Sequence, residues 1–268
     1  MPCVSMEEAG SAIGHGIKDG TRETKGGISM GEEGYKKYHE ESQTNLKENQ
    51  VAMYAPFGPT IFQARWPAPF IQYMNEWMDT VVADPELRKS YDHSSKLAGN
   101  LRHEMRMEED MWKYKPPSEK FNMGEWLGHL VNNYIKKVST GLSSGSKPAK
   151  GDVEMKEFNI IDGWINDQYA GDFNPLHKHG GDISSVTFLK VPESIVKGTE
   201  KDEAGYLLFS DGRFQKYCAM NFVQPPAVGM VYIFPHWLVH TVYPFRGEGV
   251  RRSMSFNAKV ITDHADWN

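Results

Sequence analysis

The chain has 268 residues, a length that favours one core with elaborations over two full domains. Its formal net charge of -5 gives no basic surplus, which argues against sequence-independent binding to nucleic acid. No run reaches the roughly 18 apolar residues of a membrane span, and the first thirty residues lack the order of a signal peptide. These features predict a soluble cytoplasmic protein with no membrane partner, located in the host cytoplasm if a phage encodes it.

The cysteine content restricts the kinds of metal site that the chain can build. Cys3 and Cys218 are the two cysteines, too few for a disulfide framework or a cysteine-rich zinc site. Any metal would therefore depend on carboxylates and on the ten histidines.

Residues 1–50 are rich in Gly, Glu, Lys, Ser and Thr and carry no apolar cluster before Tyr35. Such a stretch buries too little apolar surface to offset the conformational entropy lost on folding. We expect it to be a disordered or loosely attached tail.

Residues 51–150 are predicted to form a mainly helical part that packs on the core. After a short extended run at 61–66, apolar residues recur every three or four positions from Ile71 to Val82, and the pattern stops near Asp84-Pro85. A second helical pattern covers about 124–138, and the stretch 97–112 between the two is ambiguous in type.

Residues 151–268 follow a Gly/Ser/Lys/Pro hinge and are predicted to form an antiparallel core. Trp164 and Phe188 are expected to pack inside it. Many short strands with turn signals suggest a double-sheet jelly roll, and helices followed by strands make the class α+β. Eight runs rich in Ile, Val, Phe and Tyr carry this prediction: 158–165, 173–179, 183–191, 206–209, 217–223, 230–234, 239–243 and 251–260.

Potential metal ligands concentrate between positions 171 and 182. On a strand, positions i and i+2 face the same side, so His177 and His179 can point together into the space between two sheets. His240 lies near the start of a later predicted strand. Three imidazoles, or two together with the carboxylate of Asp182, suit Fe(II), Zn or Cu and leave coordination positions open.

The last predicted strand adds a potential anion site. Alternation places Arg251, Ser253 and Ser255 on one face and Arg252 on the other. A barrel-facing arginine is costly without an anionic partner, and its fork can hold a carboxylate with two hydrogen bonds. The alternative is an arginine that faces solvent on an edge strand.

Together these motifs resemble the Fe(II)- and 2-oxoglutarate-dependent oxygenases, and most closely the prolyl-4-hydroxylase-like branch with its uncharacterised bacterial and phage members. The resemblance covers about residues 158–260. It implies a double-stranded β-helix core, Fe(II) and 2-oxoglutarate as cofactor and co-substrate, and O2. The motifs that carry it are Gly-x5-His-x-His from Gly171, Asn174 to Gly180, Leu189 to Pro192, Pro-x4-His from Pro235, and Ser253 to Asn257.

Residue by residue, the resemblance makes His177 the first iron ligand and His240 the distal one. It makes Arg251, assisted by Ser253, the anchor for the far carboxylate of 2-oxoglutarate. Where most of the family has Asp or Glu two residues after the first His, this chain has His179. Either His179 replaces that carboxylate, which strand alternation favours, or the turn brings Asp182 to the metal.

The leading hypothesis is therefore a dioxygenase that hydroxylates a C–H bond of an unidentified substrate. A peptidyl proline or another protein side chain is the first choice for that substrate, and a small molecule is the second. One alternative is a cupin-like metal protein that does not use 2-oxoglutarate, and another is a non-enzymatic β-sandwich binding module. The oligomeric state, with a homodimer among the options, stays open.

Overall fold

The computed structural model describes residues 17–18, 21–22, 51–54, 58–96, 99–139, 153–196, 203–213, 216 and 219–263. The chain divides into two compact units, 1–45 and 46–268. In the first unit, β1 (Ile17–Lys18) pairs antiparallel with β2 (Thr21–Arg22). The rest of the predicted tail, and both cysteines, lie outside the described residues.

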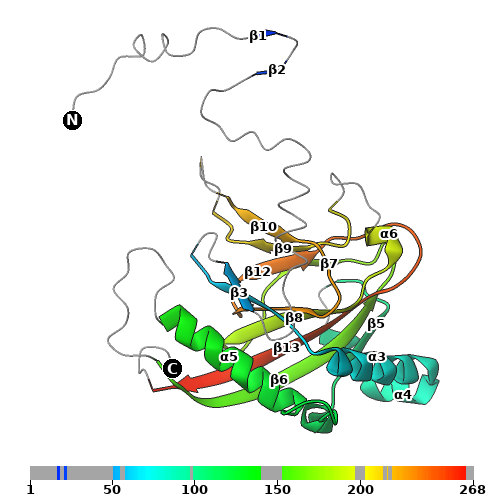
Figure 1. The fold of residues 1–268 in the computed structure, drawn as a ribbon. Helices are drawn as coiled ribbons and strands as arrows, with labels where there is room; N and C mark the ends of the chain where they lie inside the picture. Colours follow the sequence, from blue (N-terminus) through cyan, green and yellow to red (C-terminus); the bar gives the residue numbers. More distant parts are fainter. Residues whose placement is uncertain are drawn as a thin grey trace. The chain divides into compact units, whose positions relative to one another are not determined.

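The second unit contains two antiparallel sheets (Figure 1). The larger sheet has seven strands in the order β3-β4-β11-β8-β13-β6-β5, so β13 lies inside the sheet and not at its edge. Its strands are β3 (Val51–Tyr54), β4 (Ile61–Arg65), β5 (His103–Arg106), β6 (Met155–Gln168), β8 (Ile183–Lys190), β11 (Met230–Pro235) and β13 (Arg251–Thr262).

The smaller sheet has four strands in the order β10-β9-β12-β7, which leaves β7 at its edge. Each of the eight runs predicted between positions 158 and 260 overlaps one strand of the structure. The fold is α+β with the paired antiparallel sheets of the double-stranded β-helix, as predicted. The four strands are β7 (Asn174–His177), β9 (Leu207–Ser210), β10 (Asn221–Gln224) and β12 (Val239–Val242).

Both predicted helices are present and slightly longer than their apolar patterns. The first, α3 (Ala68–Ala83), ends before Asp84, whose side chain accepts hydrogen bonds from the first amides of α4 (Pro85–Tyr91). The second is α5 (Met123–Ser139). In Figure 1 the two long helices run along one side of the seven-stranded sheet. The remaining helical pieces are α6 (Glu193–Val196) and the 3-10 turns η1 (Ser94–Lys96) and η2 (Glu109–Lys113).

The region 51–150 also supplies strands. The predicted extended run at 61–66 is confirmed by β4, whereas β3 and β5 were not predicted. The segments β3, β4 and β5 all join the seven-stranded sheet, and β5 resolves part of the ambiguous stretch 97–112. A four-residue strand is too short for alternation to stand out in a sequence. The predicted helical part and the predicted core therefore share one sheet.

Alternation along the strands creates two separate apolar clusters. Residues such as Met254 and Phe256 of β13 face the helices and pack with α3 and α5. A second cluster lies on the other face of the large sheet. It contains Phe188 of β8 and Tyr232 of β11, together with Phe209 of β9 from the smaller sheet. Among the described residues, no helix has the length and hydropathy to cross a bilayer.

Candidate metal centre

Three imidazoles meet where β7 and β12 pair. His177 ends β7 and lies directly opposite His240 of β12, while His179 follows two residues after His177. One nitrogen from each ring can be chosen so that all three lie within 4.8 Å of one another. The predicted gathering of these side chains is thus a feature of the structure, and we call them the His triad.

Backbone carbonyls orient two of the rings. His177 Nδ1 lies 2.6 Å from the Pro175 carbonyl oxygen, and His240 Nδ1 lies 3.0 Å from that of Leu238. Because a carbonyl only accepts, each Nδ1 carries the proton and each Nε2 keeps a free lone pair. His179 Nε2 lies 3.2 Å from His240 Nε2. Two nitrogens bound at about 2.1 Å to one ion lie about 3.0–3.4 Å apart, so this spacing suits a shared metal.

The protonation state of the His triad favours binding of a metal cation. Burial, and secondarily the neighbouring His177, lowers the pKa of His179 to about 4. Burial also lowers the pKa of His177 and holds that of His240 well below its ordinary value of 6.5. All three rings are therefore neutral at pH 7, the protonation state in which imidazole binds metals.

Asp182, the alternative third ligand, faces another part of the molecule. Its Oδ2 accepts a hydrogen bond of 2.8 Å from the backbone N–H of Val260. Its own N–H donates to the Ala258 carbonyl, so the residue is tied to β13. Its carboxylate is not part of the group formed by His177, His179 and His240.

Arg251 is a buried cation whose hydrogen-bonding capacity is incompletely used. It is 1% exposed, its Nε donates to the Gly205 carbonyl at 3.0 Å, and its Nη1 donates to Gln168 Oε1 at 3.2 Å. Its Nη2 is buried without a partner, and the guanidinium lies over the Phe188 ring. Burial lowers its pKa to about 9, so it stays charged at neutral pH. Within the described residues no carboxylate pairs with it.

Arg251 and its cross-strand neighbour Gln168 lie on the inner face of the large sheet, as alternation predicts. Along β13 and β6 the inner residues pair as Arg251 with Gln168, Ser253 with Asn166, Ser255 with Trp164 and Asn257 with Asp162. Ser253 is 6% exposed. The solvent-facing alternative for Arg251 is therefore wrong.

Aromatic rings connect Arg251 to the triad. The guanidinium lies 4.8 Å from the centre of the Phe188 ring, and the Phe188 ring is 6.1 Å from that of Tyr232. Tyr232 contacts Phe209, whose ring is 6.1 Å from that of His240. The triad and the buried arginine thus border the same interior cluster.

A cavity of about 300 Å³ opens beside His177 and His179. Sequence reasoning missed most of its other residues and treated Trp164 only as core. Alternation on β6 places Asp162 and Trp164 on one face and could have revealed them, whereas no local signal indicated His93 or Glu104. The remaining lining residues are Asn174, Lys178, Gly180 and Asn257.

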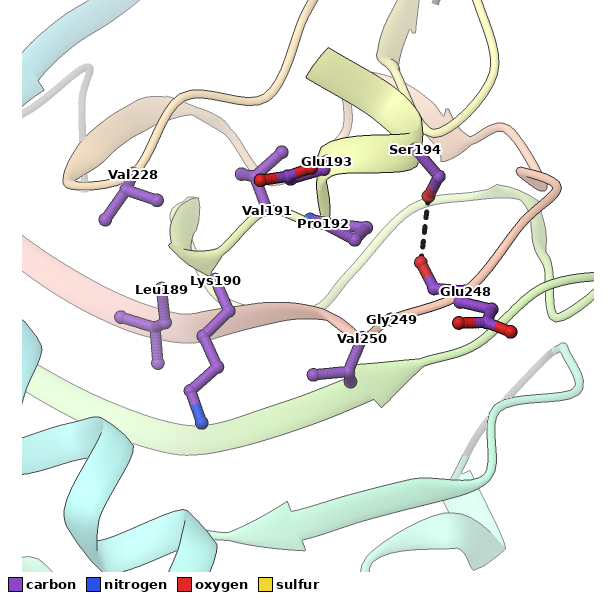
Figure 2. A pocket seen from close by; sticks show the side chains of 10 residues that line it. All are labelled: Leu189, Lys190, Val191, Pro192, Glu193, Ser194, Val228, Glu248, Gly249 and Val250. Carbon is purple, nitrogen blue, oxygen red and sulfur yellow. Dashed lines mark hydrogen bonds between the residues drawn. The ribbon is translucent and has the colours of Figure 1, made fainter. Parts of the chain in front are cut away.

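A larger hollow of about 730 Å³ lies elsewhere (Figure 2). Residues 189–194, Val228 and residues 248–250 line it, and Ser194 Oγ donates to the Glu248 carbonyl at 3.0 Å across one side. Its lining residues include neither a member of the His triad nor Arg251. The smaller cavity is therefore the candidate site, because it lies beside the potential metal ligands, although the other hollow is larger.

The central part of the chain matches a family model described as "Putative 2OG-Fe(II) oxygenase" over residues 162–257. This span contains the His triad, Arg251 and Ser253. The match covers less than half of the chain, so it shows a similarity of this segment to the 2-oxoglutarate-Fe(II) oxygenase family. No curated protein is similar enough to the chain to count as a match.

Several solved structures are similar to this chain at low identity. A prolyl-4-hydroxylase from Pseudomonas putida is 14% identical, with 77% of this chain and 91% of that chain covered and a TM-score of 0.38. A prolyl hydroxylase from Trichoplax adhaerens, in complex with a hypoxia inducible factor peptide fragment, is 11% identical, with 79% and 84% covered and a TM-score of 0.42. HygX from Streptomyces hygroscopicus, with nickel, 2-oxoglutarate and hygromycin B bound, is 10% identical, with 74% and 82% covered and a TM-score of 0.42.

Proposed function

We propose that this protein is an Fe(II)- and 2-oxoglutarate-dependent dioxygenase that hydroxylates its substrate beside the His triad. In this proposal His177, His179 and His240 hold the iron, and Arg251 with Ser253 anchors 2-oxoglutarate. The observation that carries it is a neutral, convergent His triad together with a buried arginine that lacks an anion.

The donor set supports iron binding. Imidazole is a good ligand for Fe(II), and three imidazoles leave coordination positions open for a co-substrate and O2. His179 then takes the place of the usual carboxylate, since Asp182 is engaged with the Val260 amide. A site without that carboxylate keeps more net positive charge, which favours an anionic co-substrate.

Arg251 supports the use of 2-oxoglutarate. Its Nη2 can donate to a carboxylate oxygen, and the nearby Ser253 hydroxyl can supply a second hydrogen bond. A dicarboxylate held at one end by this pair would place its other end toward the triad, across the aromatic cluster that both border.

Iron, 2-oxoglutarate and O2 together supply the oxidation of a C–H bond. The protein's own contribution is to keep the imidazoles neutral and oriented by the Pro175 and Leu238 carbonyls. The buried aromatic residues keep water away from the co-substrate. The substrate would enter through the cavity beside His177 and His179, with a protein side chain such as proline, or a small molecule, as the expected classes.

Arg251 also separates this proposal from its rivals. A cupin-like metal protein has no need of a buried cation eleven residues after its last ligand. A non-enzymatic β-sandwich module would not need three neutral imidazoles at ligating distance. The match of residues 162–257 to the oxygenase family model supports the oxygenase over both alternatives.

The decisive experiment is an anaerobic titration of the full chain with Fe(II), with and without 2-oxoglutarate, followed by visible absorption. We expect about one Fe(II) per chain and a spectral change that requires 2-oxoglutarate. His177→Ala and His240→Ala should each abolish metal binding, because two remaining ligands form an incomplete site.

His129→Ala is the matched control, since His129 lies on α5 against Phe121 and should leave metal content unchanged. Normal metal content in both His177→Ala and His240→Ala would overturn the site assignment. Metal binding without any response to 2-oxoglutarate would favour the cupin-like alternative.

A further inference from the structure

Asn174 has a buried side-chain oxygen that lacks a hydrogen-bond partner among the described residues, and Asn174 lines the cavity beside the His triad. The second asparagine of that cavity, Asn257, is satisfied, because its Oδ1 accepts from the Ser184 hydroxyl at 2.8 Å. A buried acceptor without a donor is costly. Asn174 Oδ1 therefore calls for an N–H or O–H group that the described residues do not supply.

A bulge in β7 turns the Asn174 side chain toward the triad. His177 pairs with His240 and Asn174 with Val242, so three steps along β7 match two steps along β12. In a regular strand, residues three apart face opposite sides, but one extra residue shifts the alternation by one position. Pro175 is tolerated in the bulge because a bulged residue need not donate to the ladder. Asn174 and His177 consequently line the same cavity.

The main chain of Asn174 is fixed to the strand that carries the distal histidine. The Thr241 hydroxyl donates to the Asn174 carbonyl, and Thr241 directly follows His240 in β12. The preceding residue, Phe173, accepts from the Asn100 N–H at 2.9 Å. These contacts hold the backbone and not the amide, so the side chain of Asn174 can be replaced without releasing β7.

The Asn174 amide lies against the nitrogen of His177 that is suited to bind a metal. Its Nδ2 is 3.5 Å from His177 Nε2, whose lone pair is available because Nδ1 faces the Pro175 carbonyl. That lone pair can accept from the amide N–H or bind a metal, but not both at once. An N–H directed at a metal would bring two positive groups together, whereas a half-turn of the amide about its Cβ–Cγ bond presents Oδ1 instead.

We propose that Asn174 is a positioning residue of the metal centre, and that its Oδ1 accepts a hydrogen bond from a water molecule bound to the metal beside His177. This inference rests on the proposed function, since it requires the metal, and it adds a fourth protein group to the His triad. The spacing of 3.5 Å slightly exceeds the range of about 3.0–3.4 Å between two ligands of one ion, which favours contact through a water over direct coordination. Asn174 thereby determines which open coordination position holds water until a co-substrate displaces it.

Titration of the full chain with Mn(II), followed by calorimetry and by the relaxation of water protons, tests the proposal. Asn174→Leu keeps the shape of the side chain without its polar atoms, and Asn174→Asp supplies a stronger acceptor. We expect Asn174→Leu to bind Mn(II) about three- to tenfold more weakly and to hold about one bound water fewer, because that water loses its hydrogen bond. Asn174→Asp should keep the water and bind Mn(II) about tenfold more tightly, because its acceptor is charged.

Asn257→Ala is the matched control, since its side-chain oxygen already accepts from Ser184 in the same cavity. It should change neither the affinity for Mn(II) nor the number of bound waters. Asn174→Ala should weaken Mn(II) binding as Asn174→Leu does, and it replaces that variant if leucine disturbs the fold.

Several outcomes would overturn the inference and leave the proposed function standing. Tighter binding of Mn(II) by Asn174→Leu would mean that the amide N–H keeps the His177 lone pair and competes with the metal. A gain of bound water in that variant would make Asn174 a direct ligand. Weaker binding that Asn174→Asp does not restore would make its role structural, and unchanged affinity and water number would leave it no role. Failure of the unmodified protein to bind Mn(II) would instead contradict the proposed function, and the inference with it.

Discussion

The two faces of β13 carry adjacent arginines in opposite situations. Arg252, 2% exposed, points toward the helical side, where its Nε and Nη2 donate to the two carboxylate oxygens of Asp167 at 2.6 and 2.8 Å. Its Nη1 lies 2.8 Å from Asp79 Oδ1. Arg251, 1% exposed, points between the two sheets and meets a carbonyl, an amide and a phenyl ring, with no carboxylate among the described residues.

The difference indicates that Arg252 is a cation already neutralised by the protein, whereas Arg251 is a cation that a bound anion could neutralise. The two charges of a buried ion pair neutralise each other, and removing one partner leaves an uncompensated charge in the interior. A buried arginine without an anion costs free energy in the free protein and recovers it when an anion binds. The outer face of β13 therefore contributes to stability, and under the proposed function the inner face binds the co-substrate.

The largest effect should come from Arg252→Ala, which leaves Asp167 buried without its cation. We expect a loss of about 3–5 kcal/mol in the free energy of unfolding, measured by urea denaturation, with weakened binding only as a consequence of unfolding. The double variant Arg252→Met/Asp167→Leu should recover much of that loss. A loss below about 1 kcal/mol in the single variant would remove the distinction between the two faces.

Replacing Arg251 should produce the opposite pattern. Arg251→Met should keep the free energy of unfolding unchanged or raise it, while it weakens 2-oxoglutarate binding by about ten- to a hundredfold, equivalent to about 1.5–3 kcal/mol. Calorimetric titration with 2-oxoglutarate in the presence of Mn(II) measures the change, and metal content should stay constant. Destabilisation comparable to that of Arg252→Ala would assign Arg251 to the structure and not to the co-substrate.

Acidification tests the His triad, which faces the inner side of β13 from the smaller sheet. Since burial lowers the pKa of His179 to about 4, the folded state keeps this ring neutral below the ordinary value of 6.5, where the unfolded chain becomes protonated. The metal-free protein should therefore lose stability as pH falls from about 6.5 to about 4. Allowing for the partial exposure of the ring, we expect a loss of about 1–2 kcal/mol.

Urea unfolding at a series of pH values follows this loss. His179→Gln should reduce it but not abolish it, because burial also lowers the pKa values of His177 and His240. A stability that stays constant from pH 6.5 to pH 4 would contradict the burial of neutral imidazole.

The smallest effect should come from Ser253→Ala. Removing one hydroxyl from the inner face should weaken 2-oxoglutarate binding by about 0.5–1.5 kcal/mol, the usual contribution of one hydrogen bond, and leave metal content unchanged. The same titration with Mn(II) measures it. Ser184→Ala, which removes the hydroxyl that donates to Asn257 Oδ1, is the matched control and should leave 2-oxoglutarate affinity unchanged.

Much of the core could be predicted because its signals are local. Alternation over 251–260 identified β13 and divided its two faces correctly. His177 and His179 also lie close together, but β7 ends at His177, so the backbone after the strand, and not strand alternation, places His179. The region 51–150 was predicted less completely. Its helices have a clear period, but β3 and β5 are four residues long and become strands only through pairing with β4 and β6.

The cavity beside the triad depended on contacts that no local pattern encodes. His93 and Asp162 are 69 positions apart, and Glu104 comes from a strand that was not predicted. The choice between His179 and Asp182 was likewise open, because a turn can direct a side chain to either side. The Val260 amide, 78 positions further along the chain, binds the Asp182 carboxylate, and this contact favours His179 as the proposed third ligand.

The sequence by itself determined the strands of the core, the two faces of β13 and the set of histidines that could meet, because period-two alternation and turn residues act over a few positions. Only the tertiary structure decided that Arg252 meets Asp167, 85 positions away, whereas Arg251 meets no anion among the described residues. The two arginines have the same residue type and nearly the same burial. The register of β6 beside β13 and the position of α3 distinguish them, since a partner's identity depends on which segments pack together and not on the residue's immediate neighbours.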